Sequence, residues 1–483
     1  MPRRLLACLA LAGCEPPVPQ DILAPPEVVA EPVPPASRRS PTPAELARDA
    51  CLAAHADAPE RYLGLVRAFC SEHAHLGVVG ASLAIAEHGE LRYTATAGLR
   101  CAGGEPVGVD TPFRAGSLTK LLTAALALDL ADDLLLDLDA PVPELAEHSD
   151  PRAHSITTRQ LLRHTSGLPD LTPHDTPDVP WRTTLAARPL ATAPGQLWSY
   201  SNAGYALVGV MLERITGEPY PALLARRILA PLKLSHTTAD RELALRDGAA
   251  CGHVGRGPRA IPLDVRQDLE IGARGATWTI PAGGLIASAP GLVALVLALE
   301  HRDTSPLSAS ARAALLAADT PTHERPGERQ ALALRSEPLP GGDPLYRLSG
   351  HTGDFTADLS FAPDRGFVLV LLTNTGTPLR ATLAAAHHDL LGLLPSAAPP
   401  APPAAYAGRY ILPDRGELTV TADLTISADS LALHATPLEH TGDHRFRTAN
   451  PPHAMTFVFT AGDAHATHLR ARTFVATHTP LTP

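Results

Sequence analysis

The segment that most constrains this chain is 113–126, where an extended run ends at Gly116 and an apolar helix is expected to begin. Ser117 opens this expected helix, and Lys120 follows three residues later. Because positions i and i+3 share one face of a helix, the Lys120 amine can reach the Ser117 hydroxyl. A helix start also offers free N–H groups and the positive end of the helix dipole. This local arrangement suits a nucleophile that produces an oxyanion.

A serine at a helix start is most often only an N-cap, so the tetrapeptide by itself does not decide function. The lysine content adds weight, because Lys and Arg together number 40 while the only lysines are Lys120 and Lys233. Arginine keeps its proton in proteins, whereas a buried lysine can lose it. Since the chain otherwise uses arginine for positive charge, a lysine at position 120 favours a titratable amine there.

Composition limits the classes of function. With 483 residues, 45% of them hydrophobic, the chain can bury a large core in about two or three domains. A net charge of −10, without a basic cluster near aromatic residues, argues against a nucleic-acid partner. The 22 histidines are scattered, and no Cys-x-x-Cys or His-Glu-x-x-His spacing occurs. We therefore expect neither a metal ion nor another cofactor.

The first residues have the pattern of an export signal. Two arginines precede the apolar run 5–12, which is too short to span a bilayer. The run ends in Leu-Ala-Gly-Cys14, which resembles the bacterial lipoprotein box, so 1–14 is expected to be a lipoprotein signal and Cys14 the lipidated residue. A chance cysteine in an ordinary signal peptide is the alternative. Glu15 in place of Asp implies, by the same resemblance, a lipid-anchored envelope protein on the periplasmic side of the outer membrane.

Four further cysteines remain after such a signal. An even set in an exported protein favours disulfides, and four thiols allow three pairings, among which the sequence does not choose. A pair between the first two would pin the first helices. The four residues are Cys51, Cys70, Cys101 and Cys251.

Two proline-rich runs divide the chain. Residues 15–44 hold ten prolines and predict an extended tether, and 395–405 form a second proline-rich linker. Between them, strand patterns at both ends of 45–394 enclose helices and loops. This order predicts an α+β domain in which helices flank one antiparallel sheet and an all-helical insertion interrupts it. Short alternating stretches in 406–483 predict a small β-barrel or sandwich domain.

The individual elements expected in 45–394 follow from local pattern. The helix after Ser117 is apolar nearly all round and should be buried. The other expected elements are a helical stretch at 43–72, a hairpin at 81–95, a short helix at 156–169, helices at 203–216, 291–300 and 379–393, and strands at 281–288, 346–349, 356–361 and 367–372.

Three short motifs occur in a recognisable order. They are Ser117-Leu118-Thr119-Lys120, Tyr200-Ser201-Asn202 and His351-Thr352-Gly353. Ser-x-x-Lys, Ser-Asp-Asn and Lys-Thr-Gly, in this order, mark serine β-lactamases and penicillin-binding proteins. The chain resembles this superfamily over roughly 75–395. Tyr-x-Asn resembles the class C β-lactamase and D-alanyl-D-alanine carboxypeptidase branch, and His-Thr-Gly resembles the peptidases more than the lactamases. The segments 164–169 and 281–285 also look like this family.

The resemblance implies a role for each residue of the first two motifs. Ser117 would attack a carbonyl and become acylated. Lys120, with a pKa lowered by desolvation, would accept or relay the proton, and Tyr200 would act as the second base. Asn202 would hydrogen-bond the lysine and the substrate amide. A core tyrosine and a turn asparagine are the structural alternatives for the last two.

The third motif is expected on a strand edge that faces the nucleophile. There His351 and Thr352 would bind a substrate carboxylate, and Gly353 would let the backbone approach closely. By resemblance, the N–H groups of Ser117 and Asp354 would form the oxyanion hole. Asp354 departs from the family, where a small residue is more usual, and an inward-pointing acid would repel an anionic substrate. Since His351 can be neutral or charged, an ester or short amide stays open as the substrate.

These features predict an enzyme, a serine hydrolase that works through an acyl-enzyme and is most like a D-alanyl-D-alanine carboxypeptidase or related peptidase. Its substrate would be a small molecule or peptide: a peptidoglycan stem peptide, an ester or a β-lactam. An esterase or a β-lactamase on the same fold is the close alternative. A non-catalytic lipoprotein that binds peptidoglycan or a partner is the alternative of another class. No Gly-x-Ser-x-Gly occurs, which argues against the α/β-hydrolase route.

Overall fold

The protein divides into two units, Met1–Thr42 and Pro43–Pro483, and every element described below belongs to the second. The expected signal and most of the expected tether lie outside the described residues. The computed structural model describes residues 40–171, 180–263, 277–300, 305–325, 327–393, 405–412, 416–421, 423–428, 433–442, 445–448, 456–460, 466, 468–471 and 474–479.

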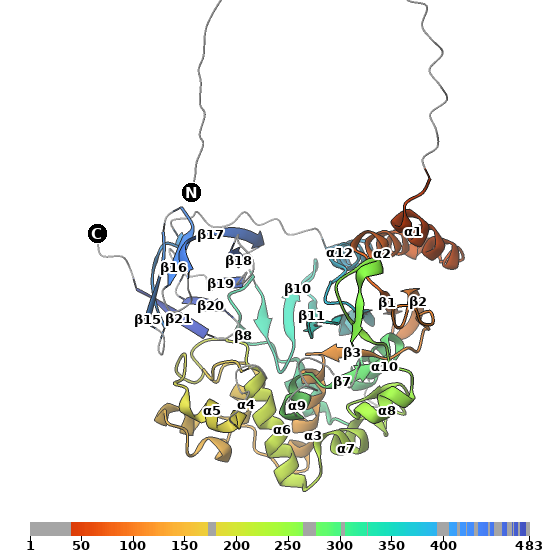
Figure 1. Ribbon diagram of the computed structural model, residues 1–483. Helices are drawn as coiled ribbons and strands as arrows, with labels where there is room; N and C mark the ends of the chain where they lie inside the picture. Colours follow the sequence, from red (N-terminus) through yellow and green to blue (C-terminus); the bar gives the residue numbers. More distant parts are fainter. Residues whose placement is uncertain are drawn as a thin grey trace, which may run out of the picture. The chain divides into compact units, whose positions relative to one another are not determined.

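An antiparallel sheet joins the two ends of the segment 45–394 (Figure 1). Its strand order is β2-β1-β13-β12-β11-β10-β9-β8, so the first hairpin pairs with the last strand. In that pairing Ala81 lies opposite Thr373 and Ala86 opposite Val368. The predicted α+β arrangement is thereby confirmed. The strands are β1 Gly80–Glu87, β2 Glu90–Gly98, β8 Thr320–Pro321, β9 Arg329–Gln330, β10 Arg335–Pro338, β11 Pro344–His351, β12 Thr356–Ala362 and β13 Phe367–Thr373.

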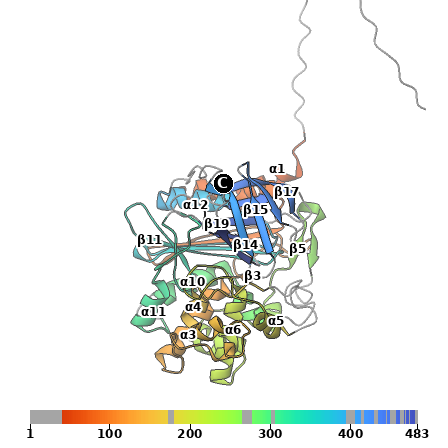
Figure 2. The same ribbon diagram turned by 90° about the vertical axis from the view of Figure 1, so that its left-hand side faces the viewer.

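Strand β13 shows why this sheet needs helices on both faces. All of its residues are buried, and successive side chains point to opposite faces. Val368 and Val370 belong to the larger hydrophobic core, whereas Leu369 and Leu371 belong to a second core. Figures 1 and 2 show the corresponding helices on the two sides of the sheet. Those of the larger core include α3 Thr119–Asp132 and α10 Ala289–Glu300, and those of the second are α1 Pro43–Ala54, α2 Leu63–Leu76 and α12 Arg380–Leu391.

Helix α3 is the buried helix that the sequence predicts, but it begins later than expected. Eleven of its 14 residues are buried, because its sequence is apolar on all sides. The first helical residue is Thr119, and Ser117 lies in the turn before it. That turn is held by Lys120 N–H donating to the Ser117 carbonyl at 3.0 Å.

Among the helices between β3 and the later strands, α6, α9 and α11 pack on α3. Strand β3 Phe113–Gly116 belongs to a small sheet of order β3-β7-β4. The small strands are β4 Thr237–Thr238, β5 Gly252–Val254, β6 Ile261–Leu263 and β7 Leu285–Ala287, and the remaining helices are α4 Thr158–Leu162, α5 Trp181–Ala187, α6 Asn202–Thr216, α7 Tyr220–Leu224, α8 Arg241–Arg246, α9 Ile280–Gly283 and α11 Ala309–Leu316.

Some expected elements are divided in the structure. The helical stretch 43–72 becomes α1 and α2, separated by a turn that contains Pro59. Residues 281–288 form the short helix α9 before strand β7, because Pro281 near a helix start has the backbone angle that a first turn requires.

The four expected disulfide cysteines form two bridges. Cys51 pairs with Cys70, 19 residues away, and Cys101 pairs with Cys251, 150 residues away. The first bridge joins α1 and α2. The second joins the segment after β2 to the start of β5, which lies beside the turn that follows β11.

Loss of the long-range bridge is expected to destabilise the fold more than loss of the short-range bridge. The longer closed loop raises the free energy of the unfolded chain by about 5 kcal/mol, because it removes conformational entropy. The shorter closed loop raises it by about 3 kcal/mol. The double variant Cys101→Ser/Cys251→Ser should therefore lose more unfolding free energy in urea than Cys51→Ser/Cys70→Ser. An equal or reversed order would show that loop closure does not govern their contributions.

The C-terminal strands form a closed barrel, which resolves the choice between barrel and sandwich. Each strand pairs with its neighbour in sequence, and the last pairs with the first. Aromatic side chains such as Tyr406, Phe446 and Phe459 fill the interior. The strands are β14 Gly408–Leu412, β15 Gly416–Val420, β16 Thr425–Ala428, β17 Leu433–Gly442, β18 Arg445–Thr448, β19 Thr456–Thr460, β20 His468–Ala471 and β21 Phe474–Thr479.

Candidate active site

Ser117 lies at a crowded turn between β3 and α3. The pairing of β3 with β7 is irregular between Arg114 and Gly116, and Gly116 has a positive φ of 50°. A side chain at Gly116 would place its Cβ 3.1 Å from the backbone nitrogen of His351. Only glycine suits both requirements. The N-cap position of α3 is Leu118, and no side chain caps this helix, so Ser117 is not an N-cap.

Lys120 and Tyr200 both reach the Ser117 hydroxyl. The Lys120 Nζ donates to Ser117 Oγ at 3.1 Å, and Ser117 Oγ lies 2.6 Å from Tyr200 Oη. The Lys120 side chain is fully buried, and its Nζ lies 4.8 Å from the centre of the Tyr200 ring. Residues from two motifs that are 80 positions apart in the chain thus meet at one hydroxyl, and a proton can pass among the three groups.

The other contacts of Lys120 Nζ complete its hydrogen bonding. It donates to Asn202 Oδ1 at 2.8 Å and to the Ala282 carbonyl at 2.7 Å. Together with Ser117 Oγ these are three acceptor atoms around the Lys120 nitrogen. In the sequence, the segment 281–285 is marked only as similar to the family. In the structure, its Ala282 carbonyl oxygen accepts a hydrogen bond from Lys120.

Asp170 is a site residue that the sequence analysis missed. The residue is 2% exposed, and its carboxylate accepts from the Asn202 backbone N–H at 2.6 Å and from Asn202 Nδ2 at 3.1 Å. Because the Nδ2 group faces this carboxylate, the Oδ1 atom of Asn202 faces Lys120. The one available signal was that Asp170 directly follows the family-like segment 164–169.

The His164 imidazole packs against the Tyr200 ring. The two ring centres are 4.6 Å apart at a tilt of 33°. His164 Nδ1 accepts from the Ser201 backbone N–H at 3.1 Å, and burial, followed by the nearby Lys120 charge, holds the pKa of this imidazole well below its usual value. The ring is therefore neutral, and it supports the loop that carries Tyr200. The backbone of His164 also has a positive φ of 58°, a strained conformation for a residue with a side chain.

The third motif lies beside Ser117. A Cβ at Gly350 would stand 3.0 Å from the Ser117 backbone nitrogen, so the end of β11 runs against this turn. The Thr352 hydroxyl donates to Asp354 Oδ1 at 2.8 Å, and the same oxygen lies 3.6 Å from Arg114 Nη1. The Asp354 carboxylate is therefore held by these two buried residues. Gly353, which separates them, has a positive φ of 80°.

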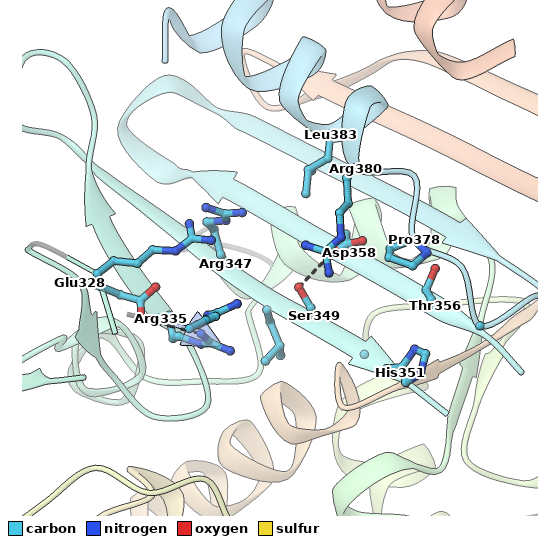
Figure 3. Close-up of a pocket in the computed structure, with 15 residues that line it drawn as sticks. Glu328, Arg335, Arg347, Ser349, His351, Thr356, Asp358, Pro378, Arg380 and Leu383 are labelled. Carbon is cyan, nitrogen blue, oxygen red and sulfur yellow. Dashed lines mark hydrogen bonds and ion pairs between the residues drawn. The ribbon is translucent and has the colours of Figure 1, made fainter. Parts of the chain in front are cut away.

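The His351 side chain lines a cavity of about 480 Å³ beside β11 and β12 (Figure 3), and the residues that line this cavity do not include Ser117, Lys120 or Tyr200. Alternate residues of β11 share one face, and this places Arg347 and Ser349 in the same lining. Ser349 donates to Asp358, whose burial raises its carboxyl pKa. Arginines therefore border the cavity beside a carboxyl whose pKa is raised by burial. Among the residues that the structure describes, no cluster of three His, Cys, Asp or Glu could hold a metal ion.

Comparison with protein families identifies the arrangement. Residues 65–394 match the family model described as Beta-lactamase, which is more than half of the chain. The chain belongs to the β-lactamase family. The resemblance inferred from the three motifs is thereby confirmed, together with the serine-hydrolase class of enzyme.

Individual relatives of this β-lactamase-family member differ in activity. Penicillin-binding protein 4 of Amycolatopsis lactamdurans is 30% identical over 321 residues, 62% of this chain and 81% of that protein. Esterase EstB of Burkholderia gladioli is 35% identical over 184 residues, 32% of this chain and 45% of that protein. The crystal structure of SurE with D-Leu has a TM-score of 0.61 and 26% identity, and it covers 90% of this chain and all of that one. The last similarity extends beyond residues 65–394.

Within the parts of the chain that the structure describes, no helix has both the length and the apolar character needed to cross a membrane.

Replacement of Asp170 by Asn is expected to lower kcat about 10- to 100-fold, because a misplaced reacting group costs about that much. An amide at this position no longer dictates which end of the Asn202 amide faces Lys120. The measurement is steady-state kinetics of both proteins, with thermal unfolding to confirm that the variant folds. Asp139→Asn, which removes an exposed ion pair with Arg159, is the control and should leave kcat unchanged.

Proposed function

We propose that this protein hydrolyses peptides or esters through an acyl-enzyme formed on Ser117. The observation that carries the proposal is the position of Ser117 Oγ, 3.1 Å from Lys120 Nζ and 2.6 Å from Tyr200 Oη. A hydroxyl placed between an amine and a phenol can lose its proton as it attacks, which is what a nucleophilic serine requires.

The proposed reaction has two halves. Ser117 Oγ bonds to the carbonyl carbon while its proton passes to the Lys120–Tyr200 pair. The resulting oxyanion is stabilised by the N–H groups of Ser117 and Asp354. As the tetrahedral intermediate collapses, the bond to the leaving group breaks, and Tyr200 returns the proton to that group. Water then attacks the carbonyl carbon of the Ser117 acyl-enzyme, with the Lys120–Tyr200 pair as base. The acyl group leaves as a carboxylic acid, and the Ser117 hydroxyl is restored.

The preferred substrate in this proposal carries a D-amino acid at the scissile bond. PBP4 is a penicillin-binding protein, and SurE was crystallised with D-Leu. His351 ends the strand that runs against the Ser117 turn, and an imidazole there suits a carboxylate on the leaving group. A D-alanyl-D-alanine carboxypeptidase or a related peptidase fits these observations. The similarity to EstB keeps an esterase as the second candidate.

Kinetics on a substrate panel tests this proposal. N-acyl-D-Ala-D-Ala, its L,L counterpart, a p-nitrophenyl ester and nitrocefin are each incubated with the protein, and acylation is followed by intact mass. We expect the D,D peptide to be hydrolysed with a kcat/KM about 100-fold above that of the L,L peptide. Turnover of the ester alone would favour the esterase. Absence of any acyl-enzyme or product would favour the non-catalytic binding lipoprotein.

For the location of the protein we propose lipidation at Cys14, which holds the enzyme at the envelope, with 15–44 as a spacer. The short apolar run, the Leu-Ala-Gly-Cys sequence and the ten prolines support this proposal. These residues lie outside the described part of the chain, apart from the last few of the spacer.

A further inference from the structure

The residue after the third motif is an acid where the family more usually has a small residue, and the structure shows that this acid is buried. The Asp354 side chain is 6% exposed and the Arg114 side chain is 5% exposed. Their charged groups approach to 3.6 Å. A buried carboxylate needs such a partner, because an unpaired one would be strongly destabilising.

The surroundings of Asp354 are shaped to receive its carboxylate. The Thr352 hydroxyl donates to Oδ1 at 2.8 Å. On the other side, a Cβ at Gly252 would collide with the carboxylate, so glycine at this position leaves the room that the acid occupies. The neighbouring Phe355 ring packs edge-on against Phe113, with centres 6.4 Å apart. These contacts come from three separate segments of the chain, and together they enclose the carboxylate.

The ion pair connects the two backbone segments that flank the candidate oxyanion hole. Arg114 lies on β3, three residues before Ser117. Asp354 lies in the tight turn between β11 and β12, where the Thr352 N–H donates to the Phe355 carbonyl at 3.1 Å. One proposed oxyanion donor, the N–H of Ser117, therefore belongs to the segment that Arg114 precedes. The other, the N–H of Asp354, belongs to the residue that Arg114 binds.

We propose that the Arg114–Asp354 pair, with the Thr352 hydroxyl, is a positioning element that sets the distance between these two N–H groups. This inference rests on the proposed function, because it concerns the oxyanion of that reaction. The Asp354 and Thr352 side chains act through the backbone, and neither needs to touch the substrate.

A consequence follows for substrate recognition. A threonine hydroxyl has one proton, and here that proton is donated to Asp354. Thr352 therefore does not supply a donor to a substrate carboxylate, and its contribution to the rate is the same whether or not the substrate has one. This separates the inference from the carboxylate-binding role that the motif resemblance implies.

The test compares Thr352→Val with the wild type on two substrates, a p-nitrophenyl ester without a carboxylate and N-acyl-D-Ala-D-Ala. We expect kcat to fall about 10- to 100-fold on both, with KM unchanged within about 3-fold, because oxyanion stabilisation acts in the transition state. Thr352→Ser, which keeps the hydroxyl, should restore most of the lost rate. A rise in KM confined to the peptide would overturn the inference and favour direct carboxylate binding.

Asp354→Asn extends the test to the ion pair and should lower kcat on both substrates in the same way. The matched control is Asp129→Asn, since Asp129 is a poorly exposed acid paired with Arg227 at 3.3 Å, and it should leave kcat unchanged. Thermal unfolding is followed for every variant. Should Asp354→Asn fail to fold, Thr352→Val decides the matter, because it keeps both charges.

Labelling with a fluorophosphonate distinguishes this inference from the proposed function. A wild-type protein that takes no label and hydrolyses neither substrate overturns both. A wild-type protein that is labelled and active, with Thr352→Val and Asp354→Asn variants of equal kcat, overturns the positioning role alone.

Discussion

Ser117→Ala should reduce hydrolysis of every substrate by about 10⁴-fold or more, because the residue that forms the acyl bond is absent. Stability should hardly change, since the Ser117 side chain caps no helix. The measurement combines steady-state rates, fluorophosphonate labelling and thermal unfolding. Labelling that persists in the alanine variant would show that another residue is the nucleophile.

Ser308 provides the matched control for this prediction. It is the N-cap of α11, and its hydroxyl accepts from the Ala311 N–H at 3.1 Å. Ser308→Ala should therefore cost about 1 kcal/mol of stability and leave kcat/KM unchanged. The two variants are expected to give opposite results. Ser117→Ala should lose activity and keep its stability, whereas Ser308→Ala should lose stability and keep its activity.

Lys120→Arg should lower kcat/KM about 10³-fold, within the range that general acid–base groups contribute. A guanidinium does not accept a proton in this pH range, and its planar fork does not match three acceptors around one nitrogen. Lys120→Met removes the amine while it keeps a similar volume, and it should lose as much activity. Rates and acyl-enzyme formation by intact mass are measured for both variants.

Lys233, the second lysine of the chain, is the control for this prediction. It is exposed, so Lys233→Arg should leave rate and stability unchanged. A Lys120→Arg variant that keeps more than a tenth of wild-type activity would show that the amine at position 120 does not carry the proton. Thermal unfolding separates this result from simple overpacking, since a larger side chain in a full core costs about 1–3 kcal/mol.

Local features of the chain could be interpreted correctly because each depends on neighbours in sequence. The hairpin of β1 and β2, the buried helix α3 and the strands around the third motif follow from side-chain periodicity and turn residues. The approach of Lys120 to Ser117 depends on a spacing of three, and it survives although the helix begins two residues later than expected. The serine-hydrolase class rests on such short motifs in a fixed order.

Contacts between distant segments were decided by the tertiary structure. The importance of Asp170 comes from its contact with Asn202, 32 residues away, and its one local mark is that it follows the family-like segment 164–169. The sequence marks Asp354 as an unusual acid but gives no sign of its partner Arg114, and the turn after β11 and strand β3 bring the two together. The pairing of the four cysteines was open for the same reason.

Taken by itself, the sequence determined most of the secondary-structure pattern, the proposed nucleophile with its lysine, and the class of chemistry, since these depend on residue type and short spacing. Only the tertiary structure decided which groups surround that nucleophile and in what state. Burial makes His164 neutral, gives Lys120 its three acceptors and turns Asp354 away from open solvent toward Arg114. Such effects arise from desolvation and long-range packing, which a linear pattern does not encode.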